Sequence, residues 1–244
     1  MSTHRLPESS DFPSGLVYTL KAPAKAAQNI LILFHGLGDT HEPFAALGTN
    51  LNLPETACLA IKGPTPLPFD INGFHWGDDI IFDQSTGGLD GDSGFKRTRK
   101  LLREVVDESL VKKCGWNPRS IFFLGFGQGG MVAVDIPAGN KSIEYGGAIS
   151  IGGALPSDLE KLEAGGLKSA TPVLLLGAEK NSVIDKSVEV KMKERFDFVK
   201  VVKWGGRDGD GMMKSREEAR PIMEFFAKRL RSMQGVPEGA VELQ

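Results

Sequence analysis

Residues 120–131 read SIFFLGFGQGGM, a short apolar run that enters a cluster of glycines. This order predicts a strand, a sharp turn and a helix. Two kinds of site are built on such a turn. A nucleophile elbow, Gly-x-Ser-x-Gly, presents a serine hydroxyl above a sheet, and a dinucleotide loop, Gly-x-Gly-x-x-Gly, lets a pyrophosphate approach the backbone. Gly125, Gly127 and Gly130 match the second spacing, whereas Gly125 and Gly129 match the first around a glycine.

Apolar strands and amphipathic helices alternate on both sides of this turn. Strands are expected at 15–20 (an edge strand), 29–34, 57–61, 145–151, 172–176 and 198–204, and helices at 42–51, 95–111, 157–164, 186–196 and 215–232. The helix after the turn is expected to stop at Pro137, and Gly63–Gly91 reads as a long irregular excursion. The alternation predicts an α/β fold, with a mostly parallel central sheet and helices on both faces.

Length and composition indicate one domain over residues 14–232, with a loose N-terminal arm at 1–13 and a flexible tail at 233–244. The formal net charge of -2 gives no reason to expect a nucleic-acid partner. No apolar run approaches the ~18 residues of a membrane span, and the N-terminus lacks a signal-peptide core. Two cysteines do not make a disulfide framework, so we expect a reducing compartment, the cytosol or the nucleus.

The surroundings of the turn favour the elbow over the dinucleotide loop. A dinucleotide loop follows the first strand of its unit, and a carboxylate near the end of the next strand holds the ribose. Here two buried strands precede the turn, and residues 150–153 after the next strand read SIGG, without a carboxylate. A hydrolase instead needs a glycine-rich loop after an earlier strand, because an N–H group of that loop helps form the oxyanion hole. The sequence HGLGD at 35–39 suits this role.

Three motifs carry a resemblance to a known family. They are LFHGLGDT at 33–40, GFGQGG at 125–130 and TPVL at 171–174. In this order they resemble the acyl-protein thioesterase and carboxylesterase branch of the α/β-hydrolases, over about residues 28–232. The resemblance implies an α/β-hydrolase fold and a carboxylester or thioester hydrolase ancestry. We expect no cofactor, and His35, Asp39 and His41 are not expected to hold a metal. It further implies an oxyanion site at the backbone N–H groups of Leu37 and Gln128, beside Gly36 and His35.

The same resemblance leaves each member of the catalytic triad altered. Gly127 stands at the position of the nucleophile, which is a serine in the family motif GFSQGG. Asn181 is the best match for the acid, and Asp210 is the best match for the histidine. All four histidines lie before the elbow in the sequence, although this fold places its catalytic histidine after the nucleophile. The sequence therefore predicts that serine-hydrolase activity is absent.

We expect a catalytically inactive member of this fold that binds a small acyl or ester-like ligand, or a protein partner, over Gly127. His75 and Trp76, in the excursion, are either walls of that pocket or core anchors. The first alternative is an active ester or thioester hydrolase in which Asp210 and Asn181 act on water. The second is a nucleotide-binding module that uses Gly125, Gly127 and Gly130.

Overall fold

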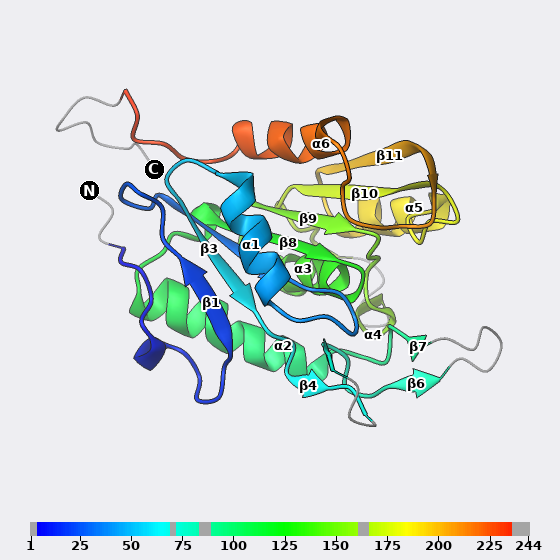
Figure 1. Cartoon of the computed structure of the whole chain (residues 1–244), viewed down its shortest axis with the longest axis horizontal. Helices are drawn as coiled ribbons and strands as arrows, with labels where there is room; N and C mark the ends of the chain where they lie inside the picture. The colour runs from blue at the N-terminus through cyan, green and yellow to red at the C-terminus, as the bar shows by residue number, and fades with distance from the viewer. Residues whose placement is uncertain (1–3, 69–71, 83–88, 161–165, 236–244) are drawn as a thin grey trace.

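A seven-stranded sheet forms the centre of the molecule (Figure 1). The computed structural model describes residues 4–68, 72–82, 89–160 and 166–235. The strand order is β1-β3-β2-β8-β9-β10-β11, and only the edge strand β1 runs antiparallel to its neighbour. The strands are β1 (Tyr18–Lys21), β2 (Asn29–Phe34), β3 (Thr56–Ile61), β8 (Ile121–Phe126), β9 (Gly147–Ile151), β10 (Val173–Lys180) and β11 (Val199–Asp208). The predicted mostly parallel α/β-hydrolase sheet is confirmed.

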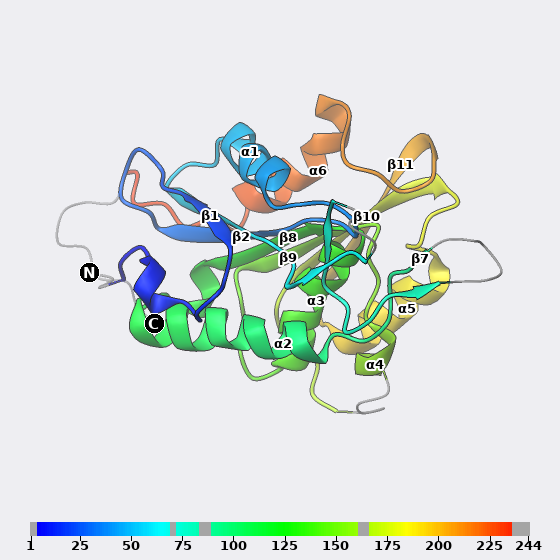
Figure 2. The same cartoon turned by 60° about the horizontal axis from the view of Figure 1, so that its bottom comes forward.

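Helices cover both faces of this sheet (Figure 2). α1 (Glu42–Leu51) and α6 (Arg216–Ala227) lie on one face. The other face carries α2 (Lys96–Arg103), α3 (Gln128–Gly139), α4 (Ser157–Glu160) and α5 (Lys186–Arg195). Side chains alternate along β2, so Ile30 and Ile32 join one apolar cluster while Leu31 and Leu33 join the other. A parallel strand buried on both faces must be apolar throughout, which explains the continuous run seen in the sequence.

The Gly63–Gly91 excursion forms two short hairpins at the carboxyl ends of the strands. β4 (Thr65–Pro66) pairs with β5 (Phe74–His75), and β6 (Ile81–Phe82) pairs with β7 (Leu89–Asp90). Figure 1 shows both hairpins on the side where β8 ends, and the two ends of the described chain on the opposite side. The excursion is thereby placed next to the elbow.

Several element boundaries differ from those predicted. α3 runs through Pro137 to Gly139, so the prediction that Pro137 stops this helix was wrong. Proline removes one N–H donor, but the chain can complete a last turn beyond it. β10 and β11 are longer than predicted, because they stay paired past a bulge between Ala178 and Lys180. The last helix ends at Ala227 instead of Ser232.

A second helix form occurs within the predicted 95–111 helix. After Arg103 the chain winds as a π-helix, η2, over Glu104–Lys113. The two segments make one continuous rod along the sheet (Figure 2).

Residues 4–13, where we expected a loose arm, lie against the end of that helix. The Arg5 amide donates to the Cys114 carbonyl at 3.0 Å, and the Trp116 indole donates to the Arg5 carbonyl at 2.8 Å. Phe12 is 7% exposed and belongs to the apolar core. At the other terminus, the Asn29 side chain binds the backbone of Arg231 through two hydrogen bonds of 2.8 and 2.9 Å. Residues 236–244 of the predicted tail and 161–164 of the predicted 157–164 helix fall outside the described residues.

Candidate functional site

Gly127 is the residue at the apex of the strand-turn-helix. Its backbone has φ 53° and ψ -119°, between the end of β8 and the start of α3. Its N–H donates to the Ile151 carbonyl at 2.8 Å, and its carbonyl accepts from the Met131 N–H at 3.0 Å. Positive φ with this ψ is a conformation that costs little only for glycine. The turn is therefore sharp and is fixed by hydrogen bonds on both sides.

Space distinguishes Gly127 from the glycines that flank it. A methyl group at Gly125 would lie 2.0 Å from the Gly129 carbonyl oxygen, and one at Gly129 would lie 2.3 Å from the Phe34 carbonyl oxygen. At Gly127 nothing lies within 4 Å of that position. The flanking glycines are required by the packing of α3 against β2 and β8. Packing does not require a glycine at position 127, because the turn has room there for a larger residue.

The loop after β2 packs beside this turn. A methyl group at Gly36 would lie 3.0 Å from the ring of Phe126, which is the residue that precedes Gly127. The Gly38 amide donates to the Phe74 carbonyl at 2.9 Å, and the Phe74 amide donates to the Asp39 carbonyl at 3.0 Å. The loop with half-buried Leu37 at its tip is thus held between the elbow and β5.

His35 is buried behind this loop, and both of its ring nitrogens have partners. Nδ1 lies 2.8 Å from the Gly36 carbonyl oxygen, and Nε2 accepts from the Gly63 amide at 2.8 Å. These partners assign the neutral tautomer with the proton on Nδ1. Burial lowers the pKa of His35 below the usual value for histidine, which favours the same neutral form. His35 is therefore a structural support of the loop in this geometry.

Gln128, the first residue of α3, connects the elbow to the excursion. Its Oε1 accepts from the Trp76 amide at 2.7 Å, and its Nε2 donates to the Gly91 carbonyl at 2.9 Å. The Trp76 indole in turn donates to the His35 carbonyl at 2.8 Å. The sequence did not predict these side-chain contacts, because nothing in a glutamine at this position indicates a partner some 50 residues away.

Trp76 and His75 are both buried, at 0% and 2% exposure. The Trp76 ring packs edge-to-face on Phe34, with ring centroids 5.3 Å apart, so it anchors the excursion on the core. The Nδ1 atom of His75 has no hydrogen-bond partner among the described residues. Burial lowers the pKa of His75, with a smaller contribution from Arg97. The neutral form is the one favoured there.

Asp210 lies after β11, on the side of the sheet where β9 and β10 end. Its two carboxylate oxygens accept from the backbone amides of Ala178 and Val183, each at 2.7 Å. A methyl group at Gly152 would lie 2.7 Å from the Asp210 Cβ, and one at Gly153 would lie 2.5 Å from the Gly127 carbonyl oxygen. Asp210 thus packs against Gly152, the residue next to the glycine that contacts the Gly127 carbonyl.

The structure does not join Asn181 to Asp210 by a hydrogen bond. The exposed Asn181 amide donates instead to Asp208 Oδ1 at 2.6 Å, and its backbone has φ 48°. Gly205–Asp208, which we placed in the loop before the last helix, belong to β11, where Asp208 pairs with Lys180. Extension of the strands moves the loop to Gly209–Ser215 and leaves Asp210 near its beginning.

Comparison with known proteins agrees with this geometry. The phospholipase/carboxylesterase family profile matches residues 18–228. The chain belongs to this family. A further finding concerns membranes: in the described part of the chain, none of the helices has the length and apolar character needed to cross a bilayer.

Individual relatives cover most of the chain. An uncharacterized hydrolase of Schizosaccharomyces pombe is 29% identical over 241 residues, which are 96% of this chain and 97% of that protein. An uncharacterized hydrolase of Mycosarcoma maydis is 30% identical over 84% of this chain and 77% of its own length. Acyl-protein thioesterase 1 of Saccharomyces cerevisiae is 24% identical, covering 86% of this chain and 97% of its own.

Solved structures of esterases share the fold. The crystal structure of esterase PE8 superposes with a TM-score of 0.70 at 20% identity, over 88% of this chain and 99% of that one. Zea mays acyl-protein thioesterase 2 superposes with a TM-score of 0.67 at 17% identity, over the same shares. Together with the sheet order, these comparisons establish the α/β-hydrolase fold.

Proposed function

We propose that this family member binds an acyl ester, thioester or acyl carboxylate over Gly127 without hydrolysing it. The observation that carries the proposal is the elbow itself. Gly127 holds the positive-φ apex with open space at its Cβ position, but it has no hydroxyl to attack a carbonyl. We infer that glycine replaces the serine of the family motif at this point. A bound carbonyl would therefore meet hydrogen-bond donors and no nucleophile.

The remaining triad positions support the same proposal. No histidine follows the elbow in the sequence, and both nitrogens of His35 are already hydrogen-bonded. Asp210, at the expected histidine position, accepts two backbone amides. Both oxygens of this carboxylate are already occupied by backbone N–H donors, so Asp210 holds the Ala178 and Val183 segments in place instead of facing a water molecule as a general base would. Hydrolysis by Asp210 and water is therefore the weaker alternative.

The ligand class follows from what surrounds Gly127. The backbone N–H groups of Leu37 and Gln128 are the proposed donors to a carbonyl or carboxylate oxygen. Half-buried Leu37, Phe126 and Met131 provide apolar surface for a hydrocarbon chain. A relative carries the name acyl-protein thioesterase, which agrees with an acyl group as the recognised part.

Binding and hydrolysis are tested separately. We expect isothermal titration to detect binding of decanoate or palmitate, and Gly127→Phe to abolish it by filling the open space. Gly15→Phe is the matched control, because Gly15 also has positive φ (83°) and nothing within 4 Å. Binding that survives Gly127→Phe contradicts the proposed position.

The hydrolase and nucleotide alternatives have their own readouts. We expect p-nitrophenyl and thioester substrates to show no turnover above buffer. Turnover that resists organophosphates and is lost in Asp210→Asn would establish the rearranged hydrolase instead. A rise in the thermal unfolding midpoint with NADH would support the nucleotide-binding module at Gly125, Gly127 and Gly130.

A further inference from the structure

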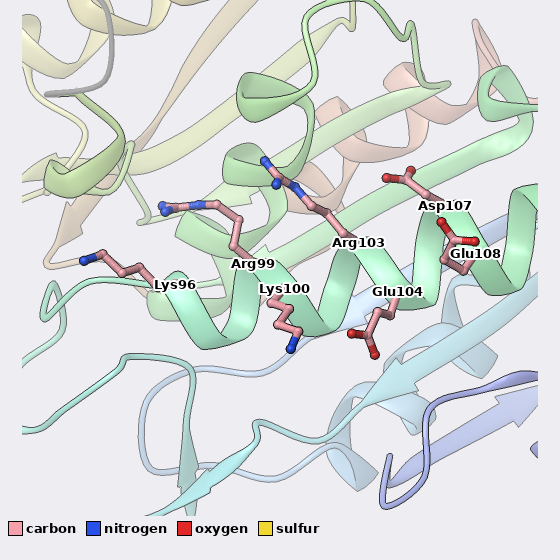
Figure 3. Close-up of a pocket in the computed structure, with 7 residues that line it drawn as sticks. All are labelled: Lys96, Arg99, Lys100, Arg103, Glu104, Asp107 and Glu108. Atoms are coloured by element: carbon pink, nitrogen blue, oxygen red, sulfur yellow. The ribbon is translucent and has the colours of Figure 1, made fainter.

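One face of the α2–η2 helix carries two blocks of opposite charge (Figure 3). Its first half carries Lys96, Lys100 and Arg103, and the following turns carry Glu104, Asp107 and Glu108. In Figure 3, Lys100 and Glu104 project to one side of the helix, and Arg103 and Asp107 project to the other. All six side chains line one open hollow of about 450 Å³, which is lined by this helix alone. The helix lies on the sheet face opposite α1 and α6 (Figure 2).

Part of this charge is compensated within the chain, because Asp107 accepts from the Tyr145 hydroxyl at 3.4 Å and interacts with Arg103. Among the described residues, no ion pair within 4.0 Å involves Lys96, Lys100, Arg103 or Glu104, whereas Glu108 pairs with Lys112 at 2.6 Å. Lys100 precedes Glu104 by four residues, which is the less favourable order for an ion pair within a helix. The positive end of the helix is complemented from outside the helix, because the Asp78 carboxylate accepts from the Lys96 and Arg97 amides at 2.8 Å each. The Lys96, Lys100 and Glu104 side chains therefore contribute little to the stability of the monomer.

We propose that this face binds the same face of a second copy of the chain, antiparallel and related by a two-fold axis. A helix face that is basic in one half and acidic in the other is its own complement when reversed. With the axis at the level of residue 102, Lys96 faces Glu108 of the second copy and Lys100 faces Glu104 of the second copy. The symmetry doubles both contacts, so four ion pairs form along about 18 Å of helix.

Other partners fit the pattern less well. An anionic membrane or an acidic peptide would be attracted to the Lys96–Arg103 block but repelled by Glu104, Asp107 and Glu108 next to it. Arg99, within the basic block, is already held by Asp135 and Asp158 at 2.7 and 2.8 Å and is not available to a partner. Exposed ion pairs contribute little individually and are screened by salt. We therefore expect a weak dimer that dissociates as ionic strength rises.

Sedimentation velocity of the full chain tests this dimer. We expect association at about 20 mM salt and a monomer at about 500 mM salt. Lys100→Glu should weaken association by about tenfold or more, because it places like charges opposite each other twice. The double variant Lys100→Glu, Glu104→Lys restores opposite charges across the axis and should recover the dimer. Lys214→Glu, on an exposed loop before α6, is the control and should change nothing.

The charge swap separates an interface from a folding defect. Lys100→Glu introduces a carboxylate near the positive end of the helix, so its thermal unfolding midpoint should not fall. A chain that stays monomeric at low salt, or a double variant that fails to recover association, overturns the proposal. Binding to phosphatidylserine vesicles that is lost in Lys100→Glu, without any self-association, overturns it in favour of a membrane surface.

Discussion

Gly127 adopts a backbone conformation that would strain any other residue. With φ 53° and ψ -119°, a side chain there costs about 1–3 kcal/mol of backbone strain. No steric clash adds to this, because nothing lies within 4 Å of the Cβ position. The consequence of a substitution at this turn is therefore set by the backbone and not by packing.

We expect Gly127→Ser to lower the free energy of unfolding by about 1–3 kcal/mol and to restore no esterase activity. Gly127→Ala should lower it by the same amount, since the strain does not depend on the hydroxyl. Urea denaturation measures both. Mass spectrometry after a fluorophosphonate treatment checks the chemistry, and phosphonylation at position 127 of the Gly127→Ser variant, with loss of fluoride, would contradict the proposed loss of the base.

The neighbouring glycine should respond quite differently. Gly125→Ala places a methyl group 2.0 Å from the Gly129 carbonyl oxygen, so the backbone of the elbow must move. We expect a loss above about 4 kcal/mol, which is exceptional for one substitution, and little soluble protein. Soluble yield and thermal unfolding, compared with Gly127→Ala, provide the measurement. Equal losses in the two variants would show that packing does not distinguish these glycines.

Elements at this end of the sheet are joined by a few buried polar side chains. Gln128 connects α3 to the excursion at Trp76 and Gly91, and Arg99 connects α2 to α3 and α4 through Asp135 and Asp158. These hydrogen bonds and ion pairs fix the position of the loops around the elbow, because a loop can move only if the side-chain contact that holds it is broken.

The Gln128 link can be followed by hydrogen exchange at the Trp76 amide. Gln128→Leu should speed this exchange by about tenfold, since the amide loses its acceptor. In Gln128→Glu the carboxylate still accepts from Trp76 but cannot donate to Gly91, so protection at Trp76 should remain. Unchanged exchange in Gln128→Leu would mean that the indole alone holds the excursion.

Arg99 is the more critical link for stability. Arg99→Met leaves the buried Asp135 carboxylate unpaired, and we expect a loss of about 3–5 kcal/mol. Arg97→Met removes a largely exposed partner of Asp78, and should cost at most about 1 kcal/mol. Chemical denaturation compares the two. The double variant Arg99→Met, Asp135→Leu should recover most of the loss, and failure to do so would argue that the arginine acts through packing.

Local sequence signals predicted some elements closely and failed at others for physical reasons. The bounds of β2 and α1 match the expected 29–34 and 42–51, because continuous apolar runs and helical spacing end there at clear turn signals. β10 and β11 exceed prediction because their extension rests on pairing with each other, with Glu179 accepting from the Gly206 amide at 2.7 Å. Such pairing is non-local, and the glycines of β11 read as a loop. The same extension of β11 to Asp208 determines where Asp210 lies, just after the end of the strand.

At the scale of the whole molecule, three buried histidines surround the end of β2. His35 precedes the Gly36–Asp39 loop, His41 follows it, and His75 lies across from it on β5. The three residues are 0%, 5% and 2% exposed, respectively. Burial lowers the pKa of each, and for His41 it outweighs the Glu42 carboxylate 3.2 Å from Nδ1. The fold therefore carries these rings in their neutral form.

This arrangement predicts loss of stability on mild acidification. Below about pH 6.5 the unfolded chain takes up protons on these histidines while the folded chain does not, so unfolding becomes more favourable. The free energy of unfolding should fall by up to about 1.4 kcal/mol per pH unit for each histidine between about pH 6.5 and the lowered folded values. Urea denaturation at about pH 7.5 and pH 5.5 measures the slope. His41→Gln should reduce it by about a third, and a flat profile would refute the prediction.

The two backbone hydrogen bonds made by Asp210 have a consequence for any attempt to return the fold to serine chemistry. Serine can be introduced at 127 with only backbone strain, but an imidazole must also be supplied from the loop after β11. Replacing Asp210 with histidine would deprive the Ala178 and Val183 amides of their acceptor and loosen the segment meant to carry the acid. Re-engineering would therefore have to redesign that segment before the imidazole is installed. Introducing the serine and the histidine one substitution at a time would give intermediate variants that are less stable than the present protein.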